Sequence, residues 1–92
     1  MREEDFRRFL LEDPNIESKI KAVNSRLSKA RSVEDHFNIN LDSYVMDDAK
    51  MHNLLLRIKD ELHDSNGAKQ NAVRKYYQFA TGREFPRLSQ IK

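Results

Sequence analysis

Hydrophobic residues recur at steps of three and four along most of the chain, the spacing that places them on one side of an α-helix. Glycine and proline, which interrupt helices, occur only twice each. The pattern therefore predicts an all-α protein in which four amphipathic helices share one core. The predicted helices cover about residues 3–11, 15–36, 47–62 and 68–81.

Local signals set the ends of these helices. Pro14 forces the preceding residue out of the helical region, so the first helix should stop near Asp13. Asp47 or Asp48 is a suitable N-cap for the third helix, and Gly82 is a typical residue just after the end of the fourth. The polar residues 63–67 form a turn.

The inward positions of the helices define a predicted core. Residues between and after the helices should cover its edges: Ile39, Leu41 and Tyr44 from a connection over 38–44, and Phe85, Pro86 and Leu88 from a tail that folds back. The four inward stripes consist of Phe6, Phe9 and Leu10; Ile16, Ile20, Val23, Leu27, Ala30 and Phe37; Met51, Leu54, Leu55, Ile58 and Leu62; and Ala72, Val73, Tyr76, Phe79 and Ala80.

Length and composition predict one domain over residues 1–92 in a reducing compartment. A chain of 92 residues buries enough surface to fold without crosslinks. Cysteine is absent, which rules out disulfides and thiolate metal sites. Apolar runs such as 54–56 are far shorter than the roughly 20 residues of a membrane span, and the amino terminus lacks the apolar stretch of a signal peptide. We expect a cytoplasmic protein.

Charge is unevenly distributed, although the net charge is only +2. Residues 18–33 contain five basic residues and no acidic one, and residues 65–83 contain four and again no acidic one. The rest of the chain holds the other eight basic residues and all fifteen acidic ones. Two helices therefore have positive surfaces, which favours a polyanionic partner.

The outer faces of these two helices have the chemistry of a DNA-binding surface. Asn and Gln pair with adenine, Arg pairs with guanine, and Lys contacts guanine or phosphate, while serines allow a duplex backbone to come close. On the helix over 68–81, Asn71, Arg74 and Gln78 would face base edges. The predicted DNA-binding residues are Lys21, Ser25, Ser28, Lys29, Lys69, Gln70, Asn71, Arg74, Lys75 and Gln78.

The stretch 65–82 (SNGAKQNAVRKYYQFATG) resembles the last helix of the core-binding domain of tyrosine recombinases and phage integrases. Residues 18–37 resemble the long basic helix of that domain, and 41–62 resemble its extended link and amphipathic helix. The resemblance covers roughly residues 5–88 and lies in helix lengths and faces rather than in a fixed signature.

That resemblance implies a compact, orthogonal, SAM-like four-helix bundle that forms half of a clamp around duplex DNA. Its second and fourth helices would meet the major groove and the adjacent backbone, through the two basic faces described above. The resemblance is the reason that Lys69 belongs to the predicted site. Recombinases cut DNA with a separate catalytic domain, and these 92 residues contain none. We therefore expect no strand cleavage and no other enzymatic activity.

Other chemistry has little support. Tyr76 lies in an apolar stripe, and Tyr77 lies at its margin, where it would be an edge residue or touch a ligand. Neither tyrosine has the cluster of Arg and His that would activate it as a nucleophile. The three histidines are far apart in sequence and form no zinc motif, so no metal is expected. Adjacent acidic pairs point about 100° apart on a helix, and the two glycines are isolated, so neither acid–base catalysis nor a nucleotide cofactor is expected.

Three alternatives remain open at this stage. The basic faces could be merely solvated, as most charged helical surfaces are. The chain could be a helical protein–protein interaction module, which would be favoured if the first helix left Phe6, Phe9 and Leu10 exposed. It could also be the amino-terminal part of a larger recombinase-like enzyme.

Overall fold

The computed structural model describes residues 1–14, 19–64 and 66–85, and within these ranges the chain forms five α-helices. They are α1 (Glu3–Leu11), α2 (Lys19–Phe37), α3 (Leu41–Val45), α4 (Asp48–Glu61) and α5 (Ala68–Thr81). The all-α class is confirmed. The prediction of four helices was wrong, because the connection over 38–44 contains the short helix α3.

Side-chain caps explain where α3 and α4 begin. Asn40 has an extended backbone, and its side chain accepts a hydrogen bond from the backbone N–H of Asp42. It is therefore the N-cap of α3, which begins at the next residue. Asp47 accepts from the backbone N–H groups of Ala49 and Lys50, as its predicted role as N-cap requires. Each cap satisfies amide groups that the first turn of a helix leaves without partners.

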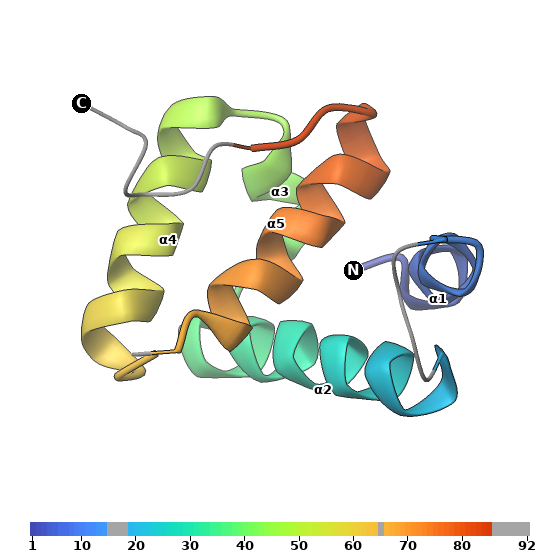
Figure 1. Cartoon of the computed structure of the whole chain (residues 1–92). Helices are drawn as coiled ribbons and strands as arrows, with labels where there is room; N and C mark the ends of the chain where they lie inside the picture. Colours follow the sequence, from blue (N-terminus) through green and yellow to red (C-terminus); the bar gives the residue numbers. More distant parts are fainter. Residues whose placement is uncertain (15–18, 65, 86–92) are drawn as a thin grey trace.

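Helix α5 occupies the centre of the molecule and packs against each of the other four helices. In Figure 1, α4 runs alongside α5, α2 crosses beneath the lower end of α5, and α1 is seen end-on beside α5. The short α3 lies behind α5 and joins α2 to α4. The two acid-free segments of the sequence, in α2 and α5, are therefore direct neighbours.

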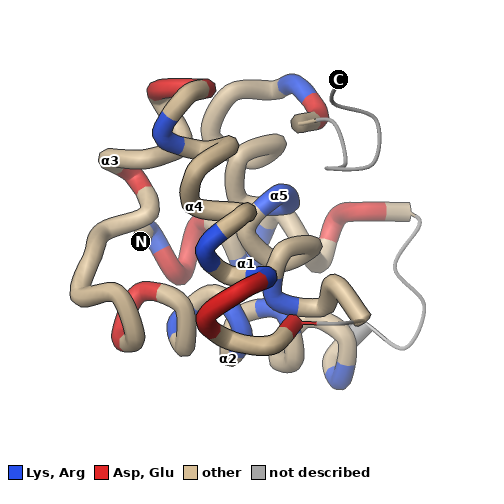
Figure 2. Tube along the Cα trace, turned by 90° about the vertical axis from the view of Figure 1, so that its left-hand side faces the viewer, with Lys and Arg blue, Asp and Glu red and all other residues tan. Residues whose placement is uncertain are grey.

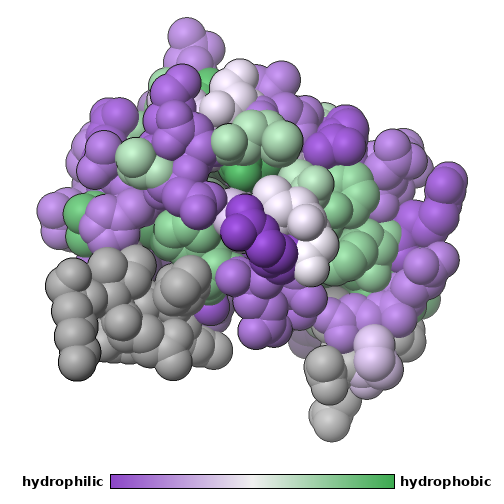
Figure 3. Space-filling model, turned by 90° about the horizontal axis from the view of Figure 1, so that it is seen from above, coloured by the Kyte–Doolittle hydropathy of each residue, from purple (hydrophilic) through white to green (hydrophobic). Residues whose placement is uncertain are grey.

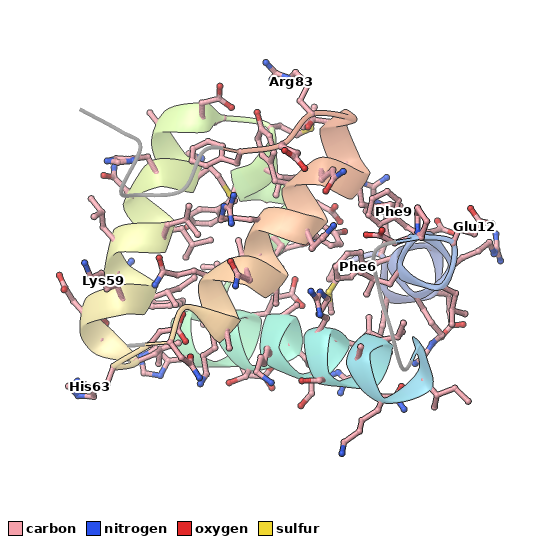
Figure 4. The ribbon with its side chains drawn as sticks, in the orientation of Figure 1. Phe6, Phe9, Glu12, Lys59, His63 and Arg83 are labelled. Carbon is pink, nitrogen blue, oxygen red and sulfur yellow. The ribbon has the colours of Figure 1, made fainter. Side chains whose placement is uncertain are left out.

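One hydrophobic core connects the five helices. The predicted residues of α4 at 51, 54, 55 and 58 are all buried, and so are Val23, Leu27 and Ala30 of α2. Phe6 and Leu10 of α1 are fully buried, and the ring of Phe6 meets that of Tyr76 edge-on at 4.9 Å between centroids. Figure 4 shows Phe6 and Phe9 on the side of α1 that faces α5.

Three core predictions need correction. Ile20 is 77% exposed rather than inward, because it lies one turn before Val23, the first buried residue of α2. Tyr77 is 2% exposed and belongs to the core rather than to its margin, and Leu41 is fully buried rather than at the core's edge. The predictions that involve Asn15, Ile16, Ser18, Ser65, Pro86 and Leu88 lie outside the described residues.

Candidate nucleic-acid interface

The packing of α2 against α5 brings part of the predicted site together around one pocket. The pocket has a volume of about 330 Å³ and is lined by α2, by the outer face of α5 and by the segment after α5. Four of the predicted residues contribute to it. The lining residues are Arg26 from α2; Asn71, Arg74, Lys75 and Gln78 from α5; and Glu84 and Phe85.

The predicted residues of α2 are spread around the helix. At about 100° per residue, Lys21 and Ser28 point away from the core, and both are exposed. Around the helix, Ser25 lies between these outer residues and Lys29. A hydrogen bond from Lys29 Nζ to Ser25 Oγ links the two side chains. Arg26 comes next and reaches α5. The surface is therefore continuous from Lys29 to the pocket, while Lys21 and Ser28 form its outer margin.

Sequence reasoning did not include Arg26 in the predicted site. Arg26 lies on the flank of α2, between the apolar stripe and the outer face. This flank becomes part of a pocket only where α2 packs against α5. The atom Nε of Arg26 is buried and has no hydrogen-bond partner among the described residues. The signal that could have found it is the helical spacing of Arg26 and Lys29, which share one flank.

Arg74 is held in place by the fold. Its Nε and Nη2 donate to the backbone carbonyl of Phe85 at 3.1 and 2.8 Å, and its Nη1 donates to Asn71 Oδ1 at 3.1 Å. Phe85 is 6% exposed, and its ring packs edge-on against Tyr77. The guanidinium thus fastens the segment after α5 to the outer face of α5.

Acidic residues from elsewhere in the chain approach both basic helices. Lys75 Nζ lies 2.8 Å from Asp13, at the end of α1, and Arg31 Nη2 lies 2.7 Å from Glu3. In Figure 2, acidic and basic positions alternate along the visible trace instead of separating into two faces. The absence of acids within each segment therefore does not make the surrounding surface free of acids.

The start of α5 is closed by its own caps. The carboxylate of Asp64, which is 5% exposed, accepts from the backbone N–H groups of Lys69 at 3.1 Å and Gln70 at 2.9 Å. Asn66 accepts from the N–H of Ala68 at 3.0 Å. These amides would otherwise suit a phosphate. The predicted residues Lys69 and Gln70 can therefore offer a ligand their side chains but not these backbone donors.

The two tyrosines of α5 are structural. Tyr76 donates to Asp42 Oδ1 at 2.6 Å and accepts from the backbone N–H of Arg2 at 2.7 Å. Burial, together with the hydrogen bond to Asp42, raises the pKa of Tyr76 to about 12. Burial and the hydrogen bond to Asp48 also raise the pKa of Tyr77. A nucleophilic phenolate needs the opposite shift.

The rest of the described surface mixes apolar and hydrophilic side chains. Seen from above, small apolar areas are separated by hydrophilic side chains (Figure 3). Among residues 1–14, 19–64 and 66–85, no three His, Asp or Glu side chains are placed to share a metal ion. No helix in the described part of the chain has the length and apolar character needed to cross a membrane.

Comparisons with protein-family models, curated proteins and solved structures found no match.

Proposed function

We propose that this chain is a DNA-binding module that holds duplex DNA on the surface formed by α2 and α5, as the core-binding domain of tyrosine recombinases does, and that it has no catalytic activity of its own. The resemblance to that domain, including a SAM-like arrangement of helices, is part of the proposal. On this surface Lys29 would contact phosphates, while α5 would lie along the groove with Arg74 toward the bases.

The observation that carries the proposal is the direct packing of α2 against α5. It brings Arg26 from one acid-free segment to the same pocket as Arg74 and Lys75 from the other. Two positive segments that lie far apart in sequence thus contribute to one outward-facing region. A duplex backbone requires positive side chains gathered on one surface.

Salt dependence of binding tests the proposal. Binding of a fluorescent duplex is measured by anisotropy at several salt concentrations. If about five phosphates are neutralised, the logarithm of the affinity should fall with the logarithm of the salt concentration with a slope of roughly −4 to −5. The proposal is wrong if no duplex binds at low salt, or if the slope is near zero.

Substitutions then locate the surface. Lys29→Ala should weaken binding to all duplexes alike, because phosphate contacts carry no sequence information. Arg74→Ala should cost about 1 to 3 kcal/mol and relax sequence preference if Arg74 reads guanine. Lys59→Ala is the matched control, since Lys59 is an exposed lysine at the periphery of α4 (Figure 4). Equal effects of Lys29→Ala and Lys59→Ala would argue against the assigned surface.

A protein–protein interaction module is less well supported. That alternative would be favoured by an undocked first helix that exposes its apolar side. In the structure Phe6 and Leu10 are fully buried, and Phe9 packs on Phe79 with ring centroids 5.6 Å apart. Helix α1 uses its apolar face inside the molecule, so it offers no comparable docking surface.

A further inference from the structure

The pocket between α2 and α5 has a lining that suits an anion. Arg26, Arg74 and Lys75 contribute three cationic side chains, and Glu84, which is exposed, is the one acidic residue of the lining. A neighbouring hollow shares Lys75 and Glu84 but is also lined by Glu12 and Asp13. An anion would therefore bind in the pocket that Arg26 lines rather than in this neighbouring hollow.

The hydrogen-bonding groups of the pocket also favour an acceptor. Asn71 uses its side-chain oxygen to accept from Arg74, and Gln78 uses its oxygen to accept from Lys75 at 3.4 Å. Both amides consequently have N–H donors left for a ligand. The lining offers mainly donors, from two different helices.

Arg26 has no hydrogen-bond partner among the described residues. Its Nε–H is buried without an acceptor there, which costs free energy. No ion pair among the described residues involves Arg26. A bound oxyanion would accept from the terminal N–H₂ groups of this guanidinium, which lines the pocket, and would bring a compensating charge to it.

We propose that this pocket binds a phosphate group, with Arg26 as the principal ligand and the side-chain amides of Asn71 and Gln78 as further donors. A tetrahedral phosphate presents acceptors in several directions at once, as donors from two helices require. This inference deepens the proposed DNA function and depends on it for the source of the phosphate, which we take to be the DNA backbone. A free phosphate ester has the same chemistry.

The test uses inorganic phosphate as the probe and nuclear magnetic resonance of the arginine Nε–H groups as the readout. The Arg26 signal is assigned by its loss in Arg26→Gln. Phosphate should shift this signal and the side-chain N–H₂ signals of Asn71 and Gln78 saturably, with a dissociation constant on the order of 1 mM. Chloride at the same ionic strength should not do so.

Two variants with the same change in charge separate the pocket from the general field. Arg26→Gln should abolish the saturable shifts of Asn71 and Gln78. Lys59→Gln, which removes an exposed charge at the periphery of α4, should leave the phosphate affinity within about twofold of wild type. Equal effects of the two variants, or shifts that chloride reproduces, would overturn the inference.

A duplex-binding arm distinguishes the two proposals from one another. If the DNA backbone supplies the phosphate, Arg26→Gln should reduce the slope of the salt dependence by about one. Saturable phosphate binding without any duplex binding would support the pocket, with a free phosphate ester as its ligand, and would overturn the DNA proposal. Duplex binding without saturable phosphate binding would do the reverse. Should Arg26→Gln fail to fold, the comparison of phosphate with chloride on the wild-type chain still decides.

Discussion

Replacement of Asp64 by Ala should destabilise the protein more than any change on its outer surface, because this carboxylate anchors the first turn of α5. Both of its oxygens accept backbone N–H groups, from Lys69 at 3.1 Å and from Gln70 at 2.9 Å. Asp64 is the one buried polar or charged residue of the described chain. Alanine would leave two amides unsatisfied at the start of the central helix.

The magnitude follows from two contributions. Loss of a helix cap costs about 0.5 to 2 kcal/mol, and loss of a negative charge near a helix N-terminus costs about 0.3 to 1 kcal/mol more. Asp64→Ala should therefore lower the free energy of unfolding by about 2 kcal/mol. For a domain of this size that corresponds to a fall in Tm of roughly 8 to 16 °C. Asp64→Asn keeps one acceptor oxygen and should lose about half as much free energy.

Thermal and urea unfolding followed by circular dichroism measure this change. Asp60→Ala is the matched control, since Asp60 is an exposed aspartate near the end of α4, and its replacement should alter stability by less than about 0.5 kcal/mol. The reasoning would be refuted if Asp64→Ala were as stable as the control, because the hydrogen bonds to the first turn would then contribute nothing.

Three further predictions concern pH, charge and backbone conformation. Because the pKa of Tyr76 is raised to about 12 from about 10, its stabilisation should persist below pH 10 and disappear as the pH rises toward 12; the absorbance change that is lost in Tyr76→Phe should lie near pH 12, and a change near pH 10 would contradict this. Asp13→Asn removes the partner of Lys75 and should strengthen duplex binding roughly threefold by anisotropy, whereas unchanged binding would place Lys75 outside the interface. Gly82→Ala should cost about 1 kcal/mol in urea unfolding because Gly82 has a φ of +76° with open space around it, and a loss above about 3 kcal/mol would indicate a clash instead.

The long helices could be predicted from the sequence because their periodicity extends over several turns. In α4 the core positions recur at steps of three and four residues. The four residues Met51, Leu54, Leu55 and Ile58 are all buried. Helix α3 has only five residues, so Leu41 and Val45 give a single repeat that cannot be distinguished from a loop. Ile20 fits the stripe of α2 but lies beyond the packed part of that helix, which no sequence pattern reveals.

The candidate site was predicted less completely, because ion pairs depend on how distant segments meet. Lys75 and Asp13 are 62 positions apart, and Arg31 and Glu3 are 28 apart. Charge segregation along the chain carries no information about such contacts. The buried Nε of Arg26, which has no partner among the described residues, could not be foreseen for the same reason, since Arg26 meets residues of α5 only in the folded chain.

The two arginines of the pocket differ in what they can offer to DNA. A bidentate contact with guanine needs two parallel N–H groups on one edge of the guanidinium. In Arg74 the edge formed by Nε and Nη2 already donates to the Phe85 carbonyl, and Nη1 donates to Asn71. Use of this edge by DNA would require Arg74 to release the backbone carbonyl of Phe85. A loss of affinity in Arg74→Ala would therefore combine a lost contact with a loosened fold. Arg26 makes no hydrogen bond or ion pair within the described part of the chain, so substitution at Arg26 removes no such contact from the fold.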